Sequence, residues 1–275
     1  MSITVNTNVA SLTAQRNLSG TQRSLQQSIA RLSSGMRITQ ASDDAAGLGI
    51  SERLKSQIRG LAQAQRNAND GVSMIQVAEG AMNEQAGILT RLRELAVQSA
   101  NGTLSSSERG FIDTEADQLV AEITRISTVT EFNGVNMLGA DAGSVSMQVG
   151  MHGTTADSLS VTFAGTSATD LGVGSLDLST ATGAASALTT IDAAIDELST
   201  DRANIGAAQN RLVVTMSNLS SMHENLAAAN SRIRDVDVAE ETAALTRAQI
   251  LSQAGVAVLA QANQLPASAL SLLSG

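Results

Sequence analysis

Apolar residues recur at seven-residue intervals over two long stretches of the chain. The first series is Leu54, Leu61, Ala68, Ile75, Met82, Leu89 and Ala96, and the second is Ile191, Leu198, Ile205, Leu212, Leu219, Leu226 and Ile233. A heptad repeat sustained over this length indicates two long helices that pack against partners along most of their length, as in coiled coils. Polar residues on the seams have two interpretations, because they either fix register or lie at the stripe edge and reach solvent. They are Arg93, Arg202, Gln209 and Asn230.

The residues around these stretches predict where the helices begin and end. Ser42 precedes Asp43 and Asp44, which predicts an N-cap with two acids near the positive end of the helix dipole. Asn101-Gly102 is typical of a helix C-terminus, so the first long helix is expected over residues 43–100.

A shorter helix follows at once. Ser105 and Glu108 match the capping-box pattern, and apolar residues continue at four–three spacing up to about Thr130.

Both ends of the chain carry helices with one apolar face and few charges. The N-terminal stripe stops at Ser33-Ser34-Gly35, and Asp237 with Glu240 marks the start of a last helix. Isolated helices of this kind gain most of their stability from packing, so we expect the two to pair and to contact other copies. The residues expected to carry polymerisation are Leu18, Leu25, Ile29, Leu32, Leu251, Val258, Leu265 and Leu270.

The middle of the chain changes period from helical spacing to alternation. Apolar residues alternate over 144–149 and 159–163, with glycines between and around them. This pattern predicts short strands and turns within about residues 131–180, forming a small hairpin unit at one end of the helices. The fold class is therefore mainly α: a long antiparallel, coiled-coil-like helical rod with a small β-hairpin unit and paired terminal helices.

Composition excludes several classes of function. The chain has 275 residues, no cysteine, two histidines and three aromatic residues, so thiolate chemistry, a histidine metal centre and base-stacking platforms lose their usual components. The net charge is −9, and residues 101–201 hold fourteen acids against Arg109 and Arg125, which argues against nucleic-acid binding.

The chemistry-bearing residues are sparse and have structural explanations. The sequence contains no nucleophile-elbow, phosphate-loop or HExxH motif. Asp43-Asp44 is better explained as a helix cap than as a pair of catalytic carboxylates, His223 lies on a heptad seam, and His152 is expected in an exposed turn. We therefore expect no enzyme, no catalytic residue, no metal ligand and no cofactor.

The two ends of the chain bear on localisation and on assembly. Residues 1–10 have no secretory signal pattern, so the chain is expected either in the cytoplasm or on an export route without such a signal. The last 28 residues carry no charge but are interrupted by five Gln and Asn side chains, which argues against a membrane span. Apolar helices that lack a partner within one copy, joined head to tail without closing, produce a helical filament.

Long blocks of the sequence resemble bacterial flagellin. They include ITVNTNVASLTAQRNL, RLSSGMRITQASDDAAGLGIS, RNANDGVSMIQVAEGAMNE and EFNGVNML in the first half. They continue with NSRIRDVDVAEETAALTRAQIL and QAGVAVLAQANQLPASALSLL near the end. Together they cover roughly residues 1–150 and 190–275, and the short region between them looks like that of a minimal flagellin without variable outer domains.

The resemblance implies a function in motility and an arrangement in two layers. It implies a structural subunit that polymerises into the flagellar filament, a helical propeller outside the cell. Residues 1–42 plus 236–275 would form the inner tube, and residues 43–180 plus 181–235 the outer tube. The alternative within assembly proteins is the hook–filament junction protein, a hook-associated protein that shares the terminal helices. The alternative from another class is a membrane-inserting protein, which the apolar termini keep open.

The resemblance also implies partners besides the homopolymer. These are an export chaperone on the C-terminal segment, hook-junction and cap proteins, and a host innate immune receptor. The receptor contact carried over from the family is Arg91, Leu95, Gln98 and Glu115, residues that are also expected near contacts between subunits. Nucleic acid and membrane insertion are not among the expected partners.

Overall fold

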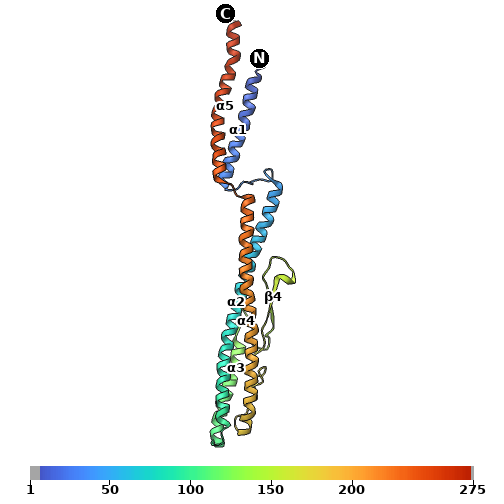
Figure 1. The fold of residues 1–275 in the computed structure, drawn as a ribbon, viewed down its shortest axis with the longest axis vertical. Coiled ribbons are helices and arrows are strands. Elements are labelled where there is room, and N and C mark those ends of the chain that lie inside the picture. Colours follow the sequence, from blue (N-terminus) through green and yellow to red (C-terminus); the bar gives the residue numbers. More distant parts are fainter. Residues whose placement is uncertain (1–6, 274–275) are drawn as a thin grey trace. The chain divides into compact units, whose positions relative to one another are not determined.

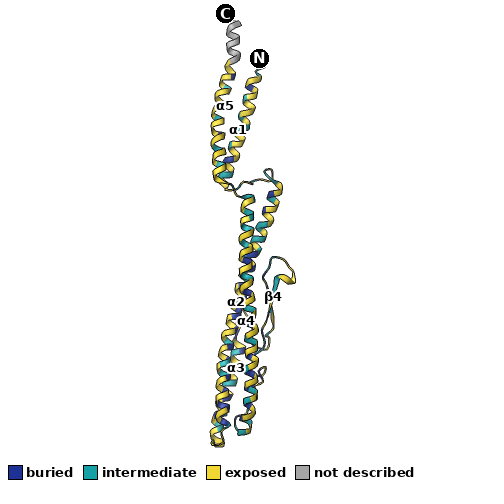
Figure 2. Cartoon of the chain, in the orientation of Figure 1, coloured by how far each residue is buried: buried dark blue, intermediate teal, exposed yellow. Residues whose placement is uncertain are grey.

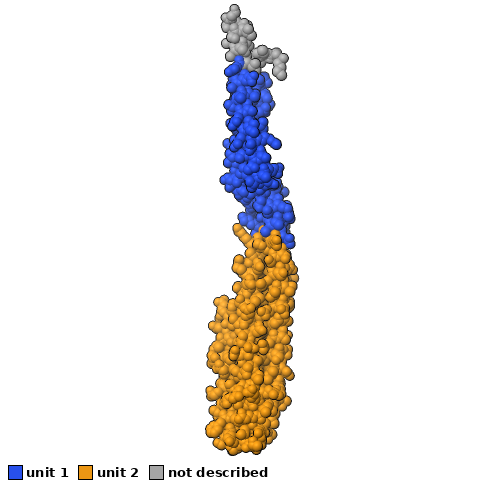
Figure 3. All heavy atoms as spheres, turned by 60° about the vertical axis from the view of Figure 1, so that its left-hand side comes forward, with its two compact units in different colours: residues 1–56, 225–275 blue, residues 57–224 orange. Residues whose placement is uncertain are grey.

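The computed structural model describes the backbone of residues 7–273. The burial of side chains is described for residues 7–264. The helices are α1 (Val9–Ser34), α2 (Ala45–Ser99), α3 (Ser106–Val129), α4 (Ala181–Arg234) and α5 (Val238–Leu273), with a 3-10 turn at Thr155–Asp157. The strands are β1 (Glu131–Phe132), β2 (Val135–Asn136), β3 (Ser144–Gln148) and β4 (Ser158–Thr162) (Figure 1). The chain divides into two compact units, residues 1–56 with 225–275 and residues 57–224 (Figure 3).

In the unit of residues 57–224, α2 and α4 run antiparallel. Arg93 on α2 bonds to Asp192 on α4 through Nε and Oδ1 at 2.6 Å. Further back along α2, Gly71 lies beside Leu212. Contacts that advance on one helix as they recede on the other define an antiparallel pair, which was predicted because each heptad stripe needs a partner to bury it.

Helix α3 packs as a third helix against α2. Arg91 bonds to Glu115 at 2.8 Å, and Arg109 Nε donates to the carbonyl of Ser99 at 2.9 Å. The predicted capping box is present, because Ser105 accepts from the Glu108 amide while the Glu108 carboxylate accepts from the Ser105 amide. The helix ends at Val129 with Thr130 as its C-cap, as predicted.

The heptad series form the core of this unit (Figure 2). The residues of both series that lie between 57 and 224 are all buried, at most 5% exposed: Leu61, Ala68, Ile75, Met82, Leu89, Ala96, Ile191, Leu198, Ile205, Leu212 and Leu219. The series members outside this range, Leu54, Leu226 and Ile233, are only half-buried. The repeat therefore correctly predicts helices along its whole length. Its apolar residues are completely buried only in the unit where α3 and the β region pack as well.

The polar residues on the seams follow both interpretations. Arg93 is half exposed and forms its ion pair at the edge of the stripe. Asn230 is half-buried and accepts a 2.8 Å hydrogen bond from Ser51, a fully buried hydroxyl on α2. Arg202 and Gln209 are also half-buried. Only Asn230 thus supports the register-fixing interpretation through a buried contact.

The β region consists of two hairpins. β1 and β2 are joined by Asn133 and Gly134, whose φ angles of 52° and 78° are those of a tight turn with both central residues left-handed. β3 pairs with β4 over five residues from Ser144↔Thr162 to Gln148↔Ser158, close to the predicted strands. Residues 163–180 form loops and turns rather than strands, although Phe163, Leu171 and Val173 are buried.

The expected position of the β3–β4 hairpin at one end of the helices is wrong. Met147 on β3 lies against Gly71, and Met151 lies beside Gly60, so the hairpin packs along the sides of α2 and α4 (Figure 1). Alternation places Met147, Leu159 and Val161 on one face of the hairpin, and that face is buried against the helices. A tip position would have left these side chains in water.

The predicted start of the first long helix is displaced by two residues. Asp44, rather than Ser42, caps α2, because its Oδ1 accepts from the Gly47 amide at 2.8 Å. Asp43 stabilises the turn before the helix by accepting from the amides of Thr39 and Gln40, both at 3.1 Å. The sequence does not show which of three adjacent residues, all common at N-caps, is the cap. Both aspartates have a structural role, as predicted, one in the cap and one in the turn before it.

Candidate assembly surface

The terminal helices α1 and α5 form an antiparallel pair. Asn8 Nδ2 donates to the carbonyl of Ala262 at 2.8 Å, and Ser11 bonds to Asn263 at 2.7 Å. At the other end of the pair, Arg31 forms an ion pair of 3.6 Å with Glu241. Small residues allow close approach between these points: a Cβ on Gly255 would lie 3.2 Å from Leu18. The predicted pairing of the terminal helices is confirmed.

The two connections that lead into this pair are bonded to one another. Arg37 N donates to the carbonyl of Arg234 at 2.7 Å, and Val236 N donates to that of Gly35 at 3.1 Å, around an antiparallel bridge between Met36 and Asp235. Gly35 ends α1 in a left-handed conformation with φ 69°, which glycine adopts without strain. The backbone bonds hold the facing ends of α1 and α5 together.

Most of the described length of α1 and α5 is exposed (Figure 2), and the exposed positions include large apolar residues. On α1 and α5 the side chains at least half exposed are Val9, Leu12, Ile29, Val238, Ile250, Leu251, Val256 and Val258. Burial on α5 is slight because a single neighbouring helix covers only one stripe of its surface. By length and composition, the segment Val238–Gln264 is also apolar enough to cross a membrane.

The predicted polymerisation residues separate into three groups. Ile29, Leu251 and Val258 lie on the exposed faces. Leu18, Leu25 and Leu32 are half-buried, and Leu18 contacts Gly255 of the partner helix. The side chains of Leu265 and Leu270 lie outside the described residues.

Sequence reasoning missed five of the exposed apolar residues. They are Val9, Leu12, Val238, Ile250 and Val256. The signal that could have found them is the width of the apolar surface, because α5 carries apolar side chains on more than the single stripe that one partner helix can cover.

The four residues carried over for receptor contact lie close together but at different depths. Arg91 bonds to Glu115 at 2.8 Å and to Glu94 at 3.0 Å, and these hydrogen bonds raise the pKa of the Arg91 guanidinium, with Glu115 as the largest cause. Gln98 is exposed two turns further along the same face of α2. Leu95 is only 1% exposed and belongs to the hydrophobic core.

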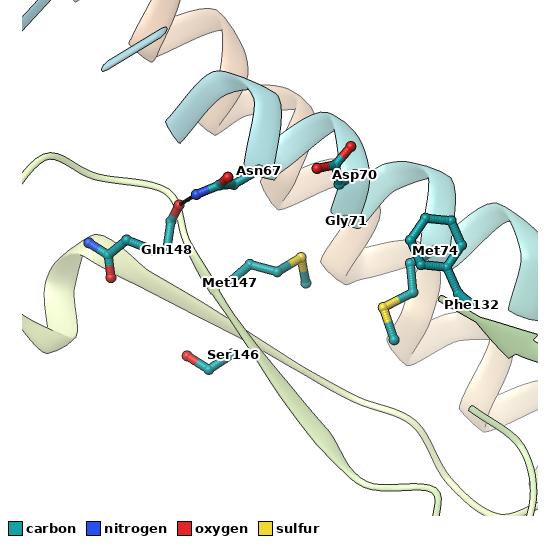
Figure 4. A pocket seen from close by; sticks show the side chains of 8 residues that line it. All are labelled: Asn67, Asp70, Gly71, Met74, Phe132, Ser146, Met147 and Gln148. Carbon is teal, nitrogen blue, oxygen red and sulfur yellow. Dashed lines mark hydrogen bonds between the residues drawn. The ribbon is translucent and has the colours of Figure 1, made fainter. Parts of the chain in front are cut away.

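The clefts of the unit of residues 57–224 hold few reactive groups. A shallow cleft of about 280 Å³ lies between α2 and β3, lined by Asp70, Met74, Phe132 and Met147 among others (Figure 4). Asn67 crosses it to donate to the carbonyl of Gln148 at 2.9 Å. Among the described residues, no group of three histidine or carboxylate side chains is placed to hold a metal ion.

Comparisons with known proteins match this architecture. Residues 5–142 match the bacterial flagellin N-terminal helical region, and residues 188–273 match the bacterial flagellin C-terminal helical region. Flagellin of Halalkalibacterium halodurans is 45% identical over 98% of this chain and 99% of its own length. The flagellar filament 33 kDa core protein of Treponema phagedenis is also 45% identical, with the same shares covered.

A solved structure agrees with these sequence matches. The crystal structure of Bacillus cereus flagellin aligns with a TM-score of 0.51 at 30% identity, covering 60% of this chain and 94% of that one. Family matches to both terminal helical regions, with no long insertion between them, agree with the short middle of the sequence. The chain therefore belongs to the bacterial flagellin family, the structural subunits that polymerise into the flagellar filament.

Proposed function

We propose that this chain assembles into its filament through the exposed apolar faces of α1 and α5. Residues 1–42 with 236–275 would form the inner tube, and residues 43–180 with 181–235 the surrounding tube. The observation that carries the proposal is the set of large apolar side chains left at least half exposed on the two terminal helices. Fully burying one such side chain contributes about 1.5–3 kcal/mol, so several of them suffice to drive association.

The role inferred for this chain is structural rather than enzymatic. Its apolar side chains are distributed along helices instead of lining one concave pocket with converging polar groups, which is the usual form of a catalytic site. Contacts that repeat between different faces of successive copies build an open helical filament when the repeat does not close into a ring.

Removing residues 248–275 tests this assembly. The truncated chain is expected to form no filaments by negative-stain electron microscopy, because α1 and its neighbours lose their apolar partner. The unit of residues 57–224 has its own core, so its helical circular dichroism and its melting transition should remain. Filaments formed by the truncated chain at the wild-type concentration would overturn the proposal.

Before assembly, the apolar face of α5 would be exposed to water. This exposure supports the proposal that an export chaperone binds the C-terminal segment. Secretion through the growing organelle, assembly beneath a cap protein and attachment through hook-junction proteins complete the proposed sequence. The chaperone from the same bacterium should form a complex with the full chain on a size-exclusion column and none with the chain lacking 248–275. Equal binding of both would contradict the placement on this segment.

A host innate immune receptor is proposed to contact Arg91, Gln98 and Glu115. The supporting observation is that these polar groups share one exposed surface and that Arg91 is already aligned by two carboxylates. Leu95 would act from the core by supporting α2. Arg91→Ala should reduce receptor signalling at least several-fold, whereas Arg125→Ala, which removes an exposed ion pair on α3, should not. Unchanged signalling by Arg91→Ala would reject the contact.

A further inference from the structure

Three arginines of the α1/α5 pair have no ionic partner among the described residues. Arg16 and Arg247 line one groove of about 500 Å³ between the two helices. Arg23 lies on α1 two turns from Arg16, and an interval of seven residues places both on the same side of that helix. All three are exposed, and neither α1 nor the part of α5 after Glu241 contains an acid within the described residues that could neutralise them.

The groove has a form that suits an inserted side chain. Gly20, Ala244 and Ala248 contribute little bulk to its walls, and Leu251 adds an apolar edge. A carboxylate entering such a groove would meet guanidinium donors while its methylene groups contact the small residues. The groove therefore favours an acidic protein segment over an apolar one.

The same chain carries a complementary acidic segment at the start of α5. Asp235, Asp237 and Glu240 lie within six residues and are exposed. Asp237 caps the helix by accepting from the amides of Ala239 and Glu240. No described side chain pairs with the carboxylates of Asp235 and Glu240, whereas Glu241 is already paired with Arg31.

The acids of this segment do not pair with the groove arginines of their own copy. Glu240 and Arg247 are seven residues apart, about 10 Å along the helix, beyond the three- or four-residue spacing that allows pairing. Arg16 is further away, because Leu18 lies beside Gly255, about 22 Å along α5 from Glu240. A second copy displaced along the helix axis by about 10–25 Å would bring its acids opposite these arginines.

We propose that the arginine groove of one copy binds the acidic start of α5 of the next copy and thereby sets the stagger between neighbours. The inference rests on the proposed assembly through α1 and α5 and adds the polar contact that positions it. Apolar faces supply affinity but permit sliding, whereas matched charges fix register and penalise the alternatives. Because the acidic and basic segments are different surfaces, the contact is head-to-tail, and the displacement along the helix axis keeps the repeat from closing into a ring.

Charge exchange tests the contact. The triple variant Arg16→Glu, Arg23→Glu and Arg247→Glu should raise the critical concentration for filament assembly about tenfold, equivalent to about 1.4 kcal/mol. The double variant Asp235→Lys and Glu240→Lys should raise the critical concentration by a similar factor. An equimolar mixture of the two should assemble near the wild-type concentration, since every contact in an alternating filament is again between opposite charges. Gln22→Glu on α1 is the control, because it adds a negative charge at an exposed position whose spacing from Arg16 and Arg23 does not allow pairing, and it should assemble normally.

The outcomes separate this inference from the assembly proposal. Normal assembly by both charge variants, combined with no assembly by the chain lacking 248–275, would overturn the groove contact alone. A mixture no better than its components would also overturn it, provided that circular dichroism shows both variants helical. The milder triple Arg→Gln variant guards against misfolding and should give a smaller rise in critical concentration. If the arginines instead serve an anionic lipid, wild type but not the triple variant will bind phosphatidylglycerol vesicles while both assemble alike, which rejects the contact.

Discussion

Gln85 Nε2 donates a hydrogen bond of 3.1 Å to the backbone carbonyl of Thr166, which lies 81 residues further along the chain. The same amide also donates to the carbonyl of Ile123 on α3 at 3.2 Å. Gln85 and Thr166 are both fully buried. One side chain on α2 thus joins α3 and the loop after the second hairpin, and its donors are satisfied only when all three segments are in place.

Gln85→Ala should destabilise the unit of residues 57–224 by about 2–4 kcal/mol. The substitution leaves a buried carbonyl without its donor and removes side-chain volume from a packed interior. Urea unfolding followed by circular dichroism measures the change. Gln76→Ala, an exposed position on the same helix, should change stability by less than about 0.5 kcal/mol. Equal midpoints for the two variants would show that the buried amide contributes nothing to stability.

Leu212→Asp should cost several kcal/mol and lower the melting temperature by many degrees. Leu212 is fully buried where α4 faces Gly71 of α2, so the carboxylate would have no partner and no water. Val213→Asp is the matched control, because the next side chain along α4 is 51% exposed. Thermal melting of the two variants distinguishes them, and similar melting would mean that the heptad stripe does not form the core.

Gly71→Ala and Gly80→Ala should change stability in opposite directions. A Cβ at Gly71 would overlap the sulfur of Met147, so this thioether, packed between β3 and α2, would have to move, at a cost of about 1–3 kcal/mol. A Cβ at Gly80 meets nothing within 4 Å, and replacing a helical glycine there should add about 0.5–1 kcal/mol. Urea midpoints provide the measurement. A stabilised Gly71→Ala variant would contradict close packing of the Met147 side chain on α2.

The turn before α2 should open in acid. Hydrogen bonds from the Thr39 amide, the Gln40 amide and the Thr39 hydroxyl lower the pKa of Asp43, with the Thr39 amide as the largest cause. A carboxyl whose pKa is lower in the folded state stabilises that state above its unfolded pKa of about 3.9, and this contribution is lost as the pH falls through the folded value. Amide hydrogen exchange at Thr39 and Gln40 should therefore lose protection below about pH 4.

The D43N variant is the control for that titration. An amide at this position keeps an acceptor oxygen but does not titrate in the acid range, so its exchange rates should follow only the intrinsic pH dependence. Identical profiles for wild type and D43N would show that the turn does not depend on the charge of Asp43.

Local sequence signals predicted the helices and most of their ends. The seven-residue repeat, the Ser105–Glu108 capping box, Asp237 before α5 and Gly35 after α1 each act through neighbouring residues of one segment. Such signals depend on backbone hydrogen bonds within a few residues, so they can be recognised without knowing what packs against the helix.

The candidate assembly surface could be predicted only in part. Ile29, Leu251 and Val258 were expected to face other copies and are exposed, but Leu18, expected to do the same, contacts α5. An apolar stripe shows which side of a helix avoids water, yet it does not show whether the cover is supplied by the same chain or by a neighbour.

The amino-acid sequence alone determined the helical segments, their antiparallel connectivity and the flagellin family, because these follow from local hydrogen bonding, from period and from blocks of matching residues. Tertiary structure decided that the hairpin lies along α2 and α4, that Gln85 joins three segments, and that Leu95 is buried in the core. It also brought Arg16 and Arg247 into one groove. The physical reason is that burial and charge pairing depend on which segments, distant in the sequence, pack together. A local pattern of residues does not specify those partners.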